Sequence, residues 1–413
     1  MTEPLRTMAE RYQRPDWVRR VNAMAGAAGS AAAVVPMSAD ELIASARATT
    51  GVDEFADLGD GDWEKRLRAL VDAIEHANLH VVGRLMTREE LLRCLRVRLL
   101  LGDARRRDRS IAEELIVSPI VITGPARSGT TILFELLALD AGLQSPIAAD
   151  VLHPASPAGV TPADRFAMSE AEQEFWSDVQ PEFASIHELR SDLPVEDITI
   201  CAPSFAGSHW AMVLDEPGAW LPDPVSDFAF HKAVLQSVQH GGPPRQWLLK
   251  TPAYIFLLDD LLANYPDASI VFTHRDVAKT MPSTASTTAM IRWLRSDGVD
   301  IQQLSDLVGM LFTAGLNTVA ERQQAGTLPA KTGHVWFTDL MGDPVAAIKA
   351  AYDAIGREFT AAHRNAVLGY LADKPRAKHG THDYTAAEWG YDVGTLRRDA
   401  APYMSTFSVK TES

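Results

Sequence analysis

The first part of the chain carries hydrophobic positions at helical spacing. Residues 39–42 begin one helix, residues 63–86 have apolar side chains three and four positions apart, and residues 88–108 continue this pattern. This spacing places the apolar side chains on one face of each helix, where they can pack against a neighbour. The sequence therefore predicts a helical N-terminal region over residues 1–115.

The pattern changes after Pro119. Residues 120–123 form a short, continuous apolar run that ends at Gly124, as is typical of a buried strand. From here to about residue 400, strand and helix patterns alternate, which predicts a parallel sheet with helices on both faces. We expect helices at 130–139, 163–179, 254–264 and 301–324, and further strands near 146–147 and at 247–249, 269–272 and 334–337.

Composition and charge narrow the class of protein. The 413 residues are 46% hydrophobic, which is enough for a sizeable core and excludes global disorder. With 39 Lys and Arg against 54 Asp and Glu, the net charge of −15 argues against nucleic acid and anionic membranes as partners. Cys94 and Cys201 are the only cysteines, so neither a disulfide framework nor a cysteine zinc site is expected.

One uncharged stretch, residues 22–39, has roughly the position of a secretion signal. It is dominated by Ala and Gly, follows a segment that contains acidic residues, and is interrupted by Pro36. It fits neither a secretion signal nor a membrane span. We therefore expect a cytoplasmic protein with no stable membrane insertion.

Between the first strand and the next helix lies a glycine-bounded loop with the features of a phosphate site. Backbone N–H groups and the start of a helix supply positive charge to a phosphate there. Thr130 stands where the nucleoside triphosphatase motif has Lys, and Arg127 offers a cation instead. This predicts a P-loop-type three-layer α/β sandwich with a central parallel sheet, residues 116–400, and the added helical region. The segment reads Gly124-Pro125-Ala126-Arg127-Ser128-Gly129-Thr130-Thr131.

The run from Arg127 to Thr131 resembles the phosphate loop of sulfotransferases that use 3′-phosphoadenosine 5′-phosphosulfate (PAPS), and in particular their bacterial branch. The resemblance implies that Arg127, Ser128, Gly129, Thr130 and Thr131 hold the 5′-phosphosulfate. It covers about residues 118–390. It also implies that no metal is required and that 3′-phosphoadenosine 5′-phosphate (PAP) is the product.

Two remote positions match the same family. Arg275 ends a predicted strand and Ser283 follows eight residues later, as in the family's site for the 3′-phosphate. Lys250 ends the strand before it, where the family places a lysine against the transferring sulfuryl group. Tyr254 departs from the pattern, because related bacterial sequences often have His there. A third, C-terminal match implies that Lys378, His379 and Gly380 fold over the adenosine and its 3′-phosphate.

Sulfonate transfer to a hydroxyl requires a base for the hydroxyl proton. Asp150 follows the expected second strand and has the position of a base in several related enzymes. His187 and Glu196 lie in a segment that is similar to one in the bacterial branch, and either could serve as the base or hold the acceptor. We rank Asp150 first among the three.

The function predicted from the sequence is transfer of a sulfonate group from PAPS to a hydroxyl of a small-molecule, lipid or glycoside acceptor. Two alternatives stay open. One is a divergent P-loop nucleotide kinase or ATPase, which would require Mg²⁺. The other is a nucleotide-binding protein without catalytic activity, which the tyrosine at position 254 favours.

Overall fold

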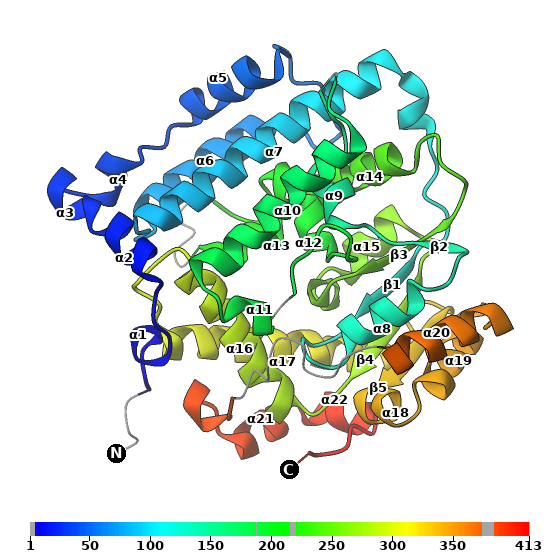
Figure 1. The fold of residues 1–413 in the computed structure, drawn as a ribbon. Coiled ribbons are helices and arrows are strands. Elements are labelled where there is room, and N and C mark those ends of the chain that lie inside the picture. The colour runs from blue at the N-terminus through cyan, green and yellow to red at the C-terminus, as the bar shows by residue number, and fades with distance from the viewer. Residues whose placement is uncertain (1–4, 158, 187, 215–219, 374–383, 413) are drawn as a thin grey trace.

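A five-stranded parallel sheet forms the centre of the molecule, with the strand order β2-β3-β1-β4-β5 (Figure 1). The computed structural model describes residues 5–157, 159–186, 188–214, 220–373 and 384–412. The strands are β1 Ile120–Thr123, β2 Leu143–Gln144, β3 Gln246–Lys250, β4 Ser269–His274 and β5 Thr332–Trp336. β1 lies between β3 and β4, so the loop that follows β1 opens between the ends of two neighbouring strands.

Alternation along the strands divides their side chains between two hydrophobic layers. Val121 and Ile270 face one layer, while Ile122 and Val271 face the other. The first layer is completed by α14 Pro224–Gln239, α15 Leu258–Asn264, α16 Val277–Trp293, α17 Ile301–Ala325, α21 Val393–Asp399 and α22 Ala401–Thr406. The second is completed by α8 Thr130–Leu137, α18 Phe337–Gly342, α19 Pro344–Ile355 and α20 Ala361–Asp373 (Figure 1). The predicted three-layer α/β architecture is confirmed.

Several helices of the connection from β2 to β3 cover the carboxyl edge of the sheet. They are α9 Ala148–Leu152, α10 Pro162–Val179, α11 Phe183–Ile186, α12 Asp197–Cys201 and α13 Ser208–Val213. The expected strand at residues 146–147 is wrong in position. The strand is Leu143–Gln144, and Ile147 makes only an isolated bridge with Pro194 before α9 begins.

The N-terminal region is helical, as predicted, and packs on the α/β layers. Its helices are α1 Met8–Arg11, α2 Asp16–Asn22, α3 Met24–Ala28, α4 Ala31–Val34, α5 Ala39–Thr50, α6 Trp63–His76 and α7 Val81–Arg107. The single helix expected over 63–86 is divided, because Leu79 pairs with Ser296 and His80 caps α7 by accepting a hydrogen bond from the N–H of Gly83 at 2.8 Å.

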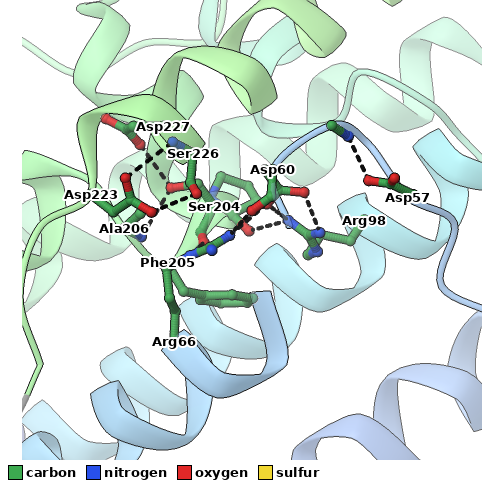
Figure 2. A network of polar contacts seen from close by, with 12 residues as sticks. Asp57, Asp60, Arg66, Arg98, Ser204, Phe205, Ala206, Asp223, Ser226 and Asp227 are labelled. Carbon is green, nitrogen blue, oxygen red and sulfur yellow. Dashed lines mark hydrogen bonds and ion pairs between the residues drawn. The ribbon is translucent and has the colours of Figure 1, made fainter. Parts of the chain in front are cut away.

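A buried ion network joins this region to the rest of the chain (Figure 2). Arg98 of α7 donates to both carboxylate oxygens of Asp60, at 2.7 and 2.9 Å, and to the carbonyl oxygen of Pro203 at 3.0 Å. Arg66 of α6 donates to Asp60 and to the carbonyl oxygen of Ser204. Since breaking a buried ion pair leaves an uncompensated charge, these contacts fix α6 and α7 against the segment before α13. Within the described residues, no helix combines the length and the apolar character that a membrane crossing needs.

Candidate active site

The loop after β1 holds its shape through close contact with β4. Gly124 has φ +142°, and a Cβ at this position would lie 2.3 Å from Thr273 Oγ1 and 2.5 Å from its carbonyl oxygen. Gly129 ends the loop at φ +90° and directly precedes α8. Both positions therefore require glycine, one for the close approach and one for the left-handed turn into the helix.

The side chains of the loop point to different surroundings. Ser128 is buried, and its hydroxyl lies 2.5 Å from both the carbonyl oxygen of Pro125 and Thr273 Oγ1. Arg127 and Thr131 are exposed, and Arg127 adopts φ +65°. The loop thus presents a cation and a hydroxyl at the N-terminus of α8, while Ser128 anchors it to β4. This is the arrangement in which an anion is bound by helix-end N–H groups.

Arg275, at the end of β4, reaches the same loop. Its Nη1 donates to the carbonyl oxygen of Arg127 at 2.8 Å, and its guanidinium lies 3.7 Å from the ring centroid of Phe337. Its other donors bind the Glu412 carboxylate. Arg275 therefore already lies at the edge of the loop, in contact with an anionic group.

Ser283 lies on α16, two turns after Arg275, and is fully buried. Among the described residues, its Oγ has no hydrogen-bond partner, and neither has Oγ1 of the buried Thr280 one turn earlier. Buried hydroxyls without partners are rare in proteins. Their presence behind Arg275 fits a group that supplies hydrogen-bonding oxygens, such as a phosphate.

Lys250 ends β3 and lies opposite Ile122 of β1 in the sheet register. Its side chain is buried, with Nζ 2.6 Å from Glu196 Oε1 and 5.7 Å from the ring centroid of Phe134. Glu196 directly precedes α12. The structure therefore brings together two of the residues that the sequence proposed, a cation and a carboxylate from segments more than fifty positions apart.

A residue that the sequence reasoning missed holds this pair in place. Asp197 accepts hydrogen bonds from the hydroxyl of Tyr254 at 2.6 Å and from the backbone N–H of Lys250 at 3.4 Å. Burial raises the pKa of Asp197 to about 7, against the opposing effect of the hydrogen bond from Tyr254. Tyr254 thus has a structural partner in this chain. The adjacent acids at 196 and 197 were the sequence signal, but only one of them was singled out.

Asp150 has different surroundings. It lies in α9, and its Oδ1 is 2.9 Å from Nη2 of Arg165 on α10. Burial raises the pKa of Asp150, and the charge of Arg165 opposes this shift. Asp150 is not among the residues that line the cavity described next. His187, Lys378, His379 and Gly380 lie outside the described residues.

A cavity of about 480 Å³ begins at the loop and extends between the helices. At one end it is lined by Ala126, Arg127, Thr130, Thr131 and Glu196. Its remaining walls come mainly from α7, α10, α13, α16 and α17. A volume of this size is typical of pockets for small molecules. Among the described residues, no group of three or more His, Cys, Asp or Glu side chains is placed to hold a metal ion.

These features define an α/β protein with an anion-binding loop and a ligand cavity at the carboxyl edge of its parallel sheet. The model of the Sulfotransferase family matches residues 119–361, more than half of the chain, and the chain belongs to this family. A comparison with curated proteins gives no match.

Two solved structures resemble the chain over most of their length. Sulfotransferase STF9 from Mycobacterium avium is 24% identical with a TM-score of 0.78, over 91% of this chain and 98% of that one. Sulfotransferase STF1 from Mycobacterium tuberculosis H37Rv is 25% identical with a TM-score of 0.73, over 89% and 99%. Because these coverages exceed the family match, the likeness includes the N-terminal helices.

Proposed function

We propose that this chain transfers a sulfonate group from PAPS to the hydroxyl of a small-molecule, lipid or glycoside acceptor. The observation that carries the proposal is the convergence of Arg127, Arg275 and the Lys250–Glu196 pair at the ends of three adjacent strands. In this proposal, residues 127–131 bind the 5′-phosphosulfate, while Arg275 and Ser283 bind the 3′-phosphate. The unpartnered hydroxyl of Ser283 supports the second assignment.

The chemistry requires one bond to form and one to break at sulfur. The acceptor oxygen bonds to sulfur while the bond from sulfur to the bridging phosphate oxygen breaks, and PAP leaves with that electron pair. Arg127 and Lys250 stabilise the negative charge on the sulfuryl and leaving oxygens. The hydroxyl proton passes to a carboxylate on the protein.

We assign the base to Glu196 in preference to Asp150. Glu196 lines the cavity beside the loop, and its partner Lys250 is the cation that the transferring group would meet. Asp150 also has a cationic partner, Arg165, but it is not among the residues that line the cavity. His187 stays a candidate of equal chemical competence, because imidazole titrates near neutral pH.

The kinase alternative lacks the lysine that bridges the terminal phosphates, since Thr130 occupies that position. The proposed place of action is the cytoplasm, since Cys94 and Cys201 are buried thiols without a disulfide. A nucleotide-binding protein without activity would keep the phosphate contacts and fail to transfer sulfonate.

The decisive experiment titrates PAP and ADP with and without Mg²⁺, and then assays sulfonate transfer from PAPS to a panel of alcohols. We expect PAP to bind more tightly than ADP, and Arg275→Ala to weaken PAP at least about tenfold with ADP nearly unchanged. Transfer should persist in the presence of a chelator. Equal losses for both nucleotides would remove the 3′-phosphate assignment, and an absolute Mg²⁺ requirement would favour the kinase.

A further inference from the structure

The cavity touches the proposed donor site on one side only. Arg127, Thr130 and Thr131 line it, whereas Ser128, Arg275 and Ser283 do not. The residues assigned to the 3′-phosphate therefore lie outside its walls. The space extends away from the sulfuryl end of the donor, which is where an acceptor has to bind.

Two helices give this space an elongated wall, which is apolar on the α17 side and carries mainly threonines on the α16 side. On α17 the lining positions are 304, 307, 308, 311 and 312, all Leu, Val or Phe, which is a continuous helical stripe. On α16 the lining runs from Thr284 to Arg292, a distance of about 12 Å at 1.5 Å per residue. Ser283, assigned to the donor, lies next to the first of these positions. The cavity thus continues for at least two turns of α16 beyond the donor site.

Two carboxylates in the wall, Glu90 and Glu172, have partners on the protein. Glu90 lies 2.9 Å from both His209 Nε2 and Arg295 Nη2. Burial would raise the pKa of Glu90, but His209, Arg295 and Arg93 together hold it well below its usual range. Glu172 lies 3.6 Å from Arg93 and 3.2 Å from His153. These two carboxylates already have cationic or imidazole partners, so neither is reserved as the counterion of a cationic acceptor.

The mouth of the cavity is apolar as well. Phe256, Leu307 and Leu311 line the cavity and are nevertheless 42%, 40% and 46% exposed. Exposed apolar side chains that continue into a cavity mark a surface for an apolar ligand. They provide an apolar route into the cavity.

From these four observations we infer that the acceptor is an uncharged, elongated alcohol with an apolar chain. Its hydroxyl lies beside Arg127 and Glu196, and its chain packs along the stripe of α17 toward Leu311. This inference rests on the proposed function for the identity of the reaction, but binding of the alcohol can be measured without it.

The test is calorimetric titration of the full chain with butan-1-ol, hexan-1-ol, octan-1-ol and decan-1-ol, with and without PAP. Each added methylene that is buried should tighten binding roughly threefold to fourfold. In the presence of PAP, octanoate should bind at least about tenfold more weakly than octan-1-ol, because the 5′-phosphate of PAP then occupies the anion-binding loop and the carboxylate would meet Glu196. Affinity that is independent of chain length, or octanoate binding more tightly than octan-1-ol in the presence of PAP, would overturn the inference.

Two neighbouring residues provide a matched pair of variants. Leu311→Asp places a charge at the mouth and should weaken decan-1-ol at least tenfold. Met310→Asp makes the same change at a side chain that is 62% exposed and outside the lining, and should leave the affinity unchanged. Equal effects of both variants would contradict the assignment, with thermal unfolding as the check on folding.

PAP titration of the same samples separates this inference from the proposed function. Chain-length-dependent binding of alcohols by a protein that does not bind PAP would support the cavity assignment and count against the donor. Tight PAP binding without any alcohol binding would support the donor assignment and contradict the inference about the acceptor.

Discussion

Arg275 donates two hydrogen bonds to the carboxylate of Glu412, from Nε to Oε1 at 2.8 Å and from Nη2 to Oε2 at 2.9 Å. This two-point geometry is the one by which a guanidinium binds phosphate. The backbone of Glu412 is held separately. Its N–H donates a hydrogen bond to the carboxylate of Asp276 at 2.7 Å, and its carbonyl oxygen accepts one from the guanidinium of Arg397 at 2.7 Å. A phosphate could therefore replace the carboxylate while the segment stays in place.

Glu412→Gln should increase the affinity for PAP by up to about tenfold. A neutral amide competes less well for the guanidinium of Arg275, and a charge-assisted bond is stronger than a neutral one by about 1 kcal/mol. The measurement is the dissociation constant of PAP by calorimetry. ADP, which has no 3′-phosphate, is the control and should bind as before. Weaker binding of PAP to this variant would show that Glu412 supports the site.

Arg127→Ala should reduce turnover by about 10²-fold or more, because a preorganised donor to the transferring group is removed. Arg127→Lys should recover part of the loss, since the charge remains and the planar fork does not. The backbone carbonyl that binds Arg275 is present in both variants. Arg364→Ala, at an exposed position of α20, is the control. Near-native turnover and PAPS affinity in Arg127→Ala would argue against the loop as the phosphosulfate site.

Glu196→Gln should reduce kcat by 10²- to 10⁴-fold while the affinity for PAP is kept, because the amide preserves shape and loses basicity. Asp150→Asn is the comparison, and it should retain most of the activity if its main partner is Arg165. The profile of kcat against pH is recorded for both. The reverse result, an inactive Asp150→Asn beside an active Glu196→Gln, would restore Asp150 as the base. If both variants keep their activity, His187 is the remaining candidate for the base.

Asp197→Asn should alter the dependence of stability on pH. The folded-state pKa of Asp197 is about 7 and its unfolded value is about 3.9, so the folded chain holds an extra proton between these limits. Asp197 therefore lowers the free energy of unfolding as pH rises through this window. Asn removes this contribution, so the stability of the variant relative to the wild type should increase from pH 4 to 7, by at most about 4 kcal/mol, and then stay constant. Urea unfolding at several pH values measures this difference, and a flat difference would contradict it.

The sequence determined the class of fold and the order of its parts. Short apolar runs such as residues 120–122 and 270–272 indicate buried strands, and glycines at 124 and 129 predict a sharp loop before a helix. Both conclusions depend on local chemistry, which is why they were accessible. The ends of helices and strands that depend on contacts with distant residues were harder to predict from the sequence. The break between α6 and α7 follows from a pairing of Leu79 with Ser296, more than two hundred positions away.

The tertiary structure decided which candidate groups meet. Lys250 and Glu196 are both polar residues at element ends, and their sequence positions do not reveal a contact of 2.6 Å. The contact between Arg275 and Glu412, 137 positions apart, is equally invisible, as is the burial that raises the pKa of Asp197. Residue type sets what a side chain can do. Distance, desolvation and counter-charge depend on how the whole chain packs. Glu196 and Asp150 each have a cationic partner, and what separates them in this protein is that Glu196 lines the cavity beside the loop and Asp150 does not.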